Sequence, residues 1–143
     1  VHLFPQVRDE LLAAMKQLAP DAWVRQCGRI IPLSQRFSDP KGLVLDLLSG
    51  TFRRKAAARG IRTNPAFAGT YDFFANPAPD FATLFPAFVK DMPAGGLVMC
   101  HPGFVDAELE RLDPLTTPRE REFAYLADDA FPDVLRRHGV ALA

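Results

Sequence analysis

Gly95–Gly103 reads GGLVMCHPG, and this stretch decides the predicted fold. Four apolar residues, Leu97–Cys100, follow a double glycine and end at a histidine. An uninterrupted apolar run of this kind is typical of a strand buried on both faces, as in a parallel sheet. Pro102 has no backbone N–H, so the strand is expected to stop there. His101 is therefore predicted at the C-terminal edge of a buried strand, where βα folds bind ligands. A hydrogen-bonded structural histidine is the alternative interpretation.

Helical and strand-like patterns alternate along the rest of the chain. Strict alternation favours right-handed βαβ units and a parallel sheet, and therefore an α/β fold. Neither GxGxxG nor a P-loop is present, so the pattern suits part of a (β/α) barrel better than a dinucleotide-binding domain. The predicted helices span residues 5–18, 40–59, 79–92, 118–130 and 132–139. The predicted strands are at 1–4, 23–27, 61–66, 97–100 and 140–142, and the predicted loops at 29–37, 67–76 and 104–116.

Residues at the predicted helix ends carry their own signals. Asp39 and Pro40 are expected as N-cap and first residue of the second helix, with Gly60 just beyond its end. Thr117 and Glu120 have the spacing of a capping box. The buried stripe of the second helix is expected to be Leu43, Val44, Leu47, Leu48 and Phe52.

Composition indicates one domain with a substantial core. The 143 residues are 48% hydrophobic, and 17 basic side chains balance 17 acidic ones. A balanced charge gives no reason to expect a nucleic acid or membrane partner. Cys27 and Cys100 lie in apolar runs and are expected as free core residues rather than a disulfide. With no signal peptide or membrane span in view, a cytoplasmic protein is predicted. Val1–Phe4 has the pattern of a strand's last residues, so an N-terminal part is expected to precede it.

Four blocks of the sequence resemble the YdjC-like carbohydrate deacetylases, which include chitooligosaccharide and hopanoid-biosynthesis deacetylases. They occur in the family's order and together cover nearly the whole chain. The blocks are Val1–Pro5 (VHLFP), Gly60–Phe73 (GIRTNPAFAGTYDF), Gly95–Gly103 and Asp113–Leu126 (DPLTTPREREFAYL).

The resemblance implies a barrel-like, metal-dependent hydrolase that removes an acetyl group from an N-acetylated sugar. The family's Asp-Asp segment is not in this sequence, so residues 1–143 are expected to be the C-terminal half of a longer catalytic domain. A divalent ion, zinc or magnesium, would take its main ligands from residues upstream of Val1. His2 matches the last histidine of the family's His-rich strand and would bind the metal or line its pocket. His101 would be the general acid, because imidazole titrates near working pH.

Other side chains have two interpretations each. Arg25, in the middle of a predicted strand, is expected to pair with a carboxylate, either at the metal site or between strands. Tyr71 and Asp72 would line a sugar pocket. Phe73 would line it too, or pack in the core.

Two further parts of the chain carry weaker signals. Arg119 and Glu122 match the family's helix after HPG, and a solvated helix face explains them equally well. His138, near a helix end, is expected to interact with the helix dipole.

Two classes of function therefore remain open. The first is a carbohydrate N-deacetylase, of which residues 1–143 alone would be inactive. The second is a non-catalytic carbohydrate-binding or assembly subunit with a half-barrel fold. Because about four strands cannot close a barrel, one strand edge is expected to be open, through which a homo-oligomer could form.

Overall fold

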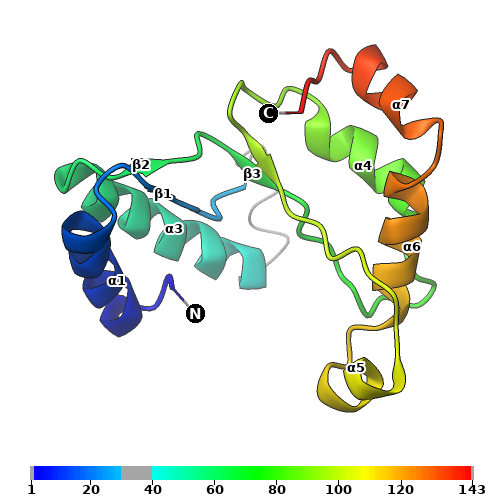
Figure 1. Ribbon diagram of the computed structural model, residues 1–143, viewed down its shortest axis with the longest axis horizontal. Coiled ribbons are helices and arrows are strands. Elements are labelled where there is room, and N and C mark those ends of the chain that lie inside the picture. Colours follow the sequence, from blue (N-terminus) through cyan, green and yellow to red (C-terminus); the bar gives the residue numbers. More distant parts are fainter. Residues whose placement is uncertain (1, 30–39, 143) are drawn as a thin grey trace. The chain divides into compact units, whose positions relative to one another are not determined.

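The computed structural model describes residues 2–29 and 40–142, which group into two compact units. The first unit consists of residues 1–68 and 93–97, and the second of residues 69–92 and 98–143. Figure 1 labels their helices and strands. The described residues mix helices with two two-stranded sheets and form no closed barrel. The α/β prediction is thus confirmed in its mixture of elements and in the parallel pairing of β1 (Trp23–Val24) with β2 (Arg62–Thr63). The predicted loop at residues 30–37 and the N-cap Asp39 lie outside the described residues.

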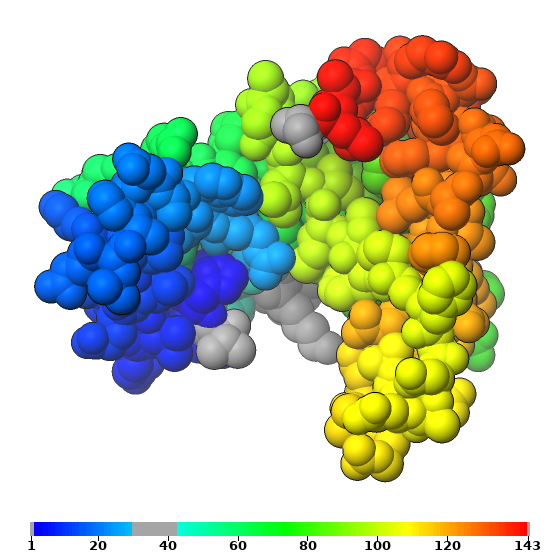
Figure 2. Space-filling model, in the orientation of Figure 1, coloured from blue at the N-terminus to red at the C-terminus, as the bar shows by residue number. Residues whose placement is uncertain are grey.

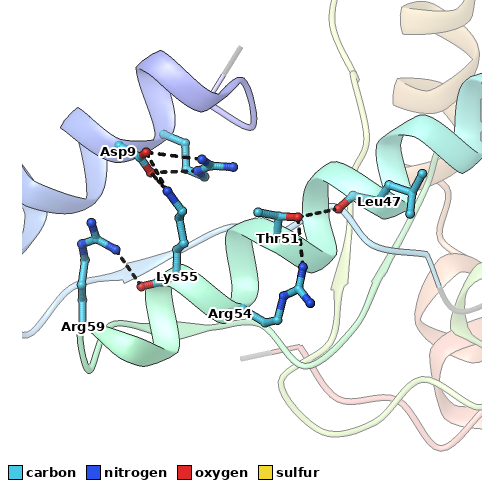
Figure 3. Close-up of polar contacts among 7 residues, drawn as sticks. Asp9, Leu47, Thr51, Arg54, Lys55 and Arg59 are labelled. Atoms are coloured by element: carbon cyan, nitrogen blue, oxygen red, sulfur yellow. Dashed lines mark hydrogen bonds and ion pairs between the residues drawn. The ribbon is translucent and has the colours of Figure 1, made fainter.

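Helix α1 (Pro5–Leu18) begins and ends where its sequence predicts, with Pro5 in the first turn. Arg8 is buried and donates to Asp9, at 2.9 Å from Nε to Oδ1. Lys55 of α3 donates to the same carboxylate at 2.7 Å, as Figure 3 shows. The Asp9 carboxylate thus joins α1 to α3. The pKa of Asp9 is held well below its usual range, first by the Arg8 hydrogen bond and then by the Lys55 one.

Helix α3 (Pro40–Ala58) ends just before Gly60, which lies beyond the helix end as predicted. Gly60 has φ +72, and its N–H donates to Ala57 O while Ile61 N donates to Ala56 O, each at 3.0 Å. These two hydrogen bonds form the Schellman motif, which requires the left-handed conformation that glycine adopts freely.

The buried line of α3 differs from the predicted stripe. Ser49, Phe52 and Ala56 are fully covered, whereas Val44 is 56% exposed and Leu47 is 66% exposed. The predicted stripe contained apolar residues alone and so missed Ser49, whose small side chain suits a helix that lies close to its neighbours.

The strands of the first unit are short because Pro65 interrupts them. Trp23 pairs with Arg62, 39 positions later, and Arg29 bridges to Phe67, 38 positions later. Between these two pairs, the segment that contains Trp23 and Arg29 is therefore one residue longer than the segment that contains Arg62 and Phe67. Strand β3 (Phe67–Ala68) begins after the proline, inside a stretch predicted as loop. The predicted strand at residues 1–4 is wrong, since His2–Phe4 form turns and a bend.

Strand β4 (Leu97–Val98) is all that forms of the strand predicted at residues 97–100. It pairs with β3, and Leu97 N donates to Ala66 O at 3.0 Å. Burial on both faces is wrong, because every residue from Leu97 to His101 is only half-buried. The run therefore has the apolar composition of a strand at the centre of a sheet, but it is not covered on both faces.

The second unit is built on an aromatic core. Helix α4 (Phe81–Val89) begins at its N-cap Asp80 and continues through Pro86. It packs against α6 (Thr117–Leu126) and α7 (Phe131–Arg137). The buried cluster consists of Phe81, Phe85, Val89, Val134 and Leu135.

Three local predictions in the second unit fail. Thr116, not Thr117, is the N-cap of α6, and no capping-box hydrogen bond forms. The predicted loop at 104–116 contains α5 (Ala107–Leu112), which has no buried residue and whose yellow atoms are uncovered in Figure 2. Residues 140–142 form no strand, although Gly139 ends α7 at φ +64 as predicted. None of the helices in the described ranges has the length and apolarity needed to span a membrane.

Candidate functional site

The residues predicted for the site fall into two groups, one in each unit. His2 and Arg25 belong to the first unit, and Tyr71, Asp72, Phe73 and His101 belong to the second. Each group is described by itself.

His101 lies in extended chain just beyond β4, and α6 holds it from one side. Its backbone N–H donates to Glu122 Oε2. Pro102 offers no donor, and the next N–H, that of Gly103, donates to Arg119 O at 3.3 Å. The donors on both sides of the proline are therefore bonded to a helix, where a longer strand would have bonded them to a sheet.

Glu122 is the most deeply buried charged residue of this group, with 1% of its surface exposed. Tyr71 Oη donates to its other oxygen, Oε1, at 2.6 Å. The solvated-face interpretation of Glu122 is therefore wrong. That of Arg119 is wrong as well, because this half-buried side chain donates to Asp113 at 2.6 Å and to Leu115 O at 2.7 Å.

Burial and the Glu122 carboxylate both act on neighbouring acidic groups. Burial, followed by the hydrogen bond to Glu122, raises the pKa of the Tyr71 phenol far above its usual value. Burial, followed by the charge of Glu122, raises the pKa of Cys100 to about 11. Both groups are thus protonated at neutral pH, so Cys100 is not poised as a nucleophile.

The aromatic side chains bring Tyr71 and His101 to the same ring. The Phe73 ring centroid lies 4.2 Å from that of Tyr71 and 5.1 Å from that of His101, which it meets edge to face at 85°. Nδ1 of His101 is buried and has no hydrogen-bond partner. His101 is thus held through its backbone N–H and packed against Phe73, while Nδ1 of its ring has no hydrogen-bond partner.

A shallow hollow lies beside Tyr71 and Phe73. Its cavity volume is about 10 Å³, which is room for about one water molecule and far below the roughly 300–1,000 Å³ of ordinary ligand pockets, so it does not enclose a sugar ring. Asp72 does not line it: this exposed side chain accepts from Phe74 N at 3.1 Å and stabilises a local turn. The lining residues are Tyr71, Phe73, Ala78, Pro79, Phe81, Pro118 and Arg121.

His2, in the first unit, is held by the end of the β1 strand region. Its Nε2 lies 3.0 Å from Arg25 O and 4.0 Å from Cys27 Sγ, and its ring meets Phe52 edge to face at 5.4 Å. A carbonyl only accepts, so Nε2 carries the proton and Nδ1 carries the lone pair. Burial lowers the pKa of His2 more than its bond to Arg25 raises it. A neutral imidazole is the form that binds a metal ion.

The Arg25 side chain is exposed. Its guanidinium carbon lies 6.0 Å from the centroid of the Phe67 ring, a cation–π contact. Within the described residues it forms neither of the two predicted ion pairs.

The described residues do not by themselves fit a metal ion. In the part of the chain that the structure covers, no three His, Cys, Asp or Glu side chains gather as a metal site requires. His2 Nε2 lies 4.0 Å from Cys27 Sγ, but this nitrogen is already bonded to Arg25 O. A metal bound here would need ligands from outside these residues.

Sequence reasoning missed what Glu122 does. The signal was its spacing: Glu122 stands four residues before Leu126, and so lies on the same helix face as that apolar residue. A carboxylate on an inward face needs donors, and sequence does not show that Tyr71 and His101 would supply them.

Comparison with known proteins identifies one family. No curated protein and no solved structure matches the chain. The model of the YdjC-like protein family matches residues 1–137, and the chain therefore belongs to this family of carbohydrate deacetylase-related proteins.

Proposed function

We propose that this chain takes part in removing the acetyl group from an N-acetylated sugar, as the acid-bearing part of a metal-dependent hydrolase. The observation that carries the proposal is His101, whose backbone is held by a buried carboxylate while its buried Nδ1 lacks a partner. Family membership supports the same chemistry.

In amide hydrolysis a water oxygen bonds to the acyl carbon and the C–N bond breaks. The sugar nitrogen must take up a proton as it leaves, and the products are acetate and the free amine. His101 is proposed to donate that proton, a role that imidazole serves well near neutral pH. Tyr71 and Phe73 would offer aromatic surface to the sugar ring, and Asp72, which is exposed outside the hollow, would accept from a sugar hydroxyl at the rim.

The divalent ion, zinc or magnesium, belongs to the proposal only through ligands outside the described residues. His2 would contribute its Nδ1, and Arg25 would pair with a carboxylate from the same outside part. When bound, such an ion activates water and polarises the carbonyl. Residues 1–143 alone are accordingly expected to lack activity.

The cellular setting is also proposed. Cys27 and Cys100 are free thiols, which suits the reducing cytoplasm. Association of copies through an open strand edge stays a prediction.

A second candidate is a carbohydrate-binding or assembly subunit without catalytic activity. The adjoining aromatic rings of Tyr71 and Phe73, which such a subunit would use to bind a sugar, favour it. The two candidates differ in acetate release.

The test is acetate release from N-acetylglucosamine oligomers, with and without added zinc or magnesium. It is run on residues 1–143 and on the chain as its gene encodes it, including any residues ahead of Val1. His101→Ala should lower metal-dependent turnover by about 10²–10⁴-fold, as loss of a general acid does. His138→Ala, at the exposed C-cap of α7, is the matched control and should leave turnover unchanged.

Three results would count against this assignment. Full turnover by His101→Ala would remove His101 from the chemistry. Metal-dependent acetate release by residues 1–143 alone would show that they hold the metal. No release by the encoded chain, combined with measurable binding of the oligomers, would favour the binding subunit.

A further inference from the structure

We propose that Glu122 is a positioning residue, which fixes the backbone of His101 and the hydroxyl of Tyr71 so that both face the same substrate. The inference rests on the proposed function for its catalytic part. It rests on geometry alone for the contact it describes.

Glu122 connects three segments that are far apart in the sequence. Oε2 accepts from the His101 backbone, 21 residues earlier, and Oε1 accepts from the Tyr71 hydroxyl, 51 residues earlier. Both segments also contact the Phe73 ring. One side chain of α6 therefore holds two sides of the candidate site.

Pro102 explains why a helix has to provide this support. A strand would bond alternate N–H groups to its neighbour, but β4 ends at Val98 and Pro102 has no N–H. Without Glu122 the His101 N–H would have no partner. With Glu122 and the carbonyl of Arg119, the N–H groups on both sides of the proline are bonded to α6.

The negative charge has a specific purpose in this arrangement. A buried carboxylate is costly unless donors surround it, and both oxygens of Glu122 have one. Bonds to a charged acceptor are roughly twice as strong as neutral ones. None of the ion pairs among the described residues involves Glu122, so its charge is directed to His101 and Tyr71.

Replacing Glu122 by glutamine keeps the shape and removes the charge. The amide oxygen can still accept from His101, and its NH₂ can donate to Tyr71 once the hydroxyl rotates, so the fold is expected to survive. The test variant is Glu122→Gln, with Glu122→Asp as a second variant that keeps the charge on a shorter side chain. Glu120→Gln is the matched control, because Glu120 is an exposed carboxylate of the same helix.

The first readout is hydrogen exchange of the His101 backbone amide, followed by NMR on the chain as its gene encodes it. We expect Glu122→Gln to speed exchange by about 10- to 100-fold, the range for weakening a hydrogen bond to a charged group. Glu120→Gln should leave it unchanged, and Glu122→Asp should lie between. Unchanged exchange in Glu122→Gln would overturn the proposal without reference to any activity.

The second readout is the kinetics of acetate release. We expect Glu122→Gln to lower kcat by about tenfold or more with KM little changed, and Glu122→Asp to recover part of the loss. Faster exchange with unchanged kcat would reduce Glu122 to a structural residue, and a raised KM with unchanged kcat would assign it to sugar binding. Either result overturns the positioning role. No acetate release from the unmodified chain overturns the proposed function and the catalytic part with it, while exchange still decides whether Glu122 anchors His101.

Discussion

Each unit of the molecule has a proline directly after a buried or half-buried polar residue, and the two units complete the interrupted hydrogen bonding in different ways. In the first unit, Asn64 precedes Pro65 and bonds to Gln26: Gln26 N donates to its Oδ1 at 2.9 Å, and its Nδ2 donates to Gln26 O at 3.1 Å. In the second unit, His101 precedes Pro102, and the carboxylate of Glu122 accepts its N–H.

We interpret the hydrogen bonding of the first unit as structural and that of the second unit as functional. The amides of Asn64 and Gln26 are neutral, and each uses both its donor and its acceptor inside the first unit. The second unit instead buries an ionisable group and leaves Nδ1 of His101 without a partner. A neutral network in which every group is hydrogen-bonded indicates a role in stability. A buried charge beside an unpaired ring nitrogen indicates a site that binds or acts on a ligand.

The largest expected effect is on the free energy of unfolding, and it is tested by substituting one glycine in each unit. Gly69 and Gly60 both have positive φ, at +97 and +72. A Cβ on Gly69 would lie 2.7 Å from Met99 N, among backbone atoms that cannot move aside, whereas a Cβ on Gly60 would meet nothing within 4 Å. Gly69→Ala is expected to cost about 3–5 kcal/mol and Gly60→Ala about 1–2 kcal/mol, measured by urea unfolding.

Equal losses in the two variants would contradict this prediction. They would show that the close approach of Gly69 to Met99 adds nothing to the conformational cost that both glycines share.

The next effect tests whether the amide network of the first unit is purely structural. Asn64→Ala leaves the N–H and C=O of Gln26 without their partners in a buried place, at an expected cost of about 2–3 kcal/mol. Gln17→Ala, an exposed amide on α1, is the control and should change the free energy of unfolding by less than about 0.5 kcal/mol. In an active protein, Asn64→Ala should leave KM unchanged at temperatures where it is folded. A selective loss of activity without loss of stability would place Asn64 in the site and end the contrast between the units.

The same contrast shows which features could be predicted from sequence. Local signals succeeded: Pro5 begins α1, and Gly60 and Gly139 end α3 and α7, because backbone conformation at a helix end depends on a few adjacent residues. Features that depend on distant partners failed. Thr117 and Glu120 have the right spacing for a capping box, but the helix begins one residue earlier than that motif needs.

Burial was the hardest property to infer. The run Leu97–Cys100 is apolar but only half-covered, while Glu122 is charged and 1% exposed. Residue type gives the cost of burying a side chain, and the partners that offset that cost come from other segments. His101, Tyr71 and Phe73 were selected by sequence and do lie together, yet the residue that holds them was assigned equally well to a solvated face.

The smallest expected effect concerns the exposed carboxylate of Asp9, the counterpart in the first unit to buried Glu122. Its pKa lies well below the usual value because Arg8 and Lys55 donate to it. A depressed pKa stabilises the fold at pH values above the unfolded-state pKa, near 4, and this contribution is lost as pH falls below it. Asp9→Asn should therefore lower the urea midpoint slightly at pH 7, and the difference should shrink between about pH 4 and pH 2 and in high salt. Asp21→Asn removes an exposed carboxylate that has no ion pair among the described residues, and should change little at either pH. A difference for Asp9→Asn that was as large at pH 2 as at pH 7 would mean that the side chain acts through its shape and hydrogen bonds, and that surface charge contributes nothing measurable to joining α1 and α3.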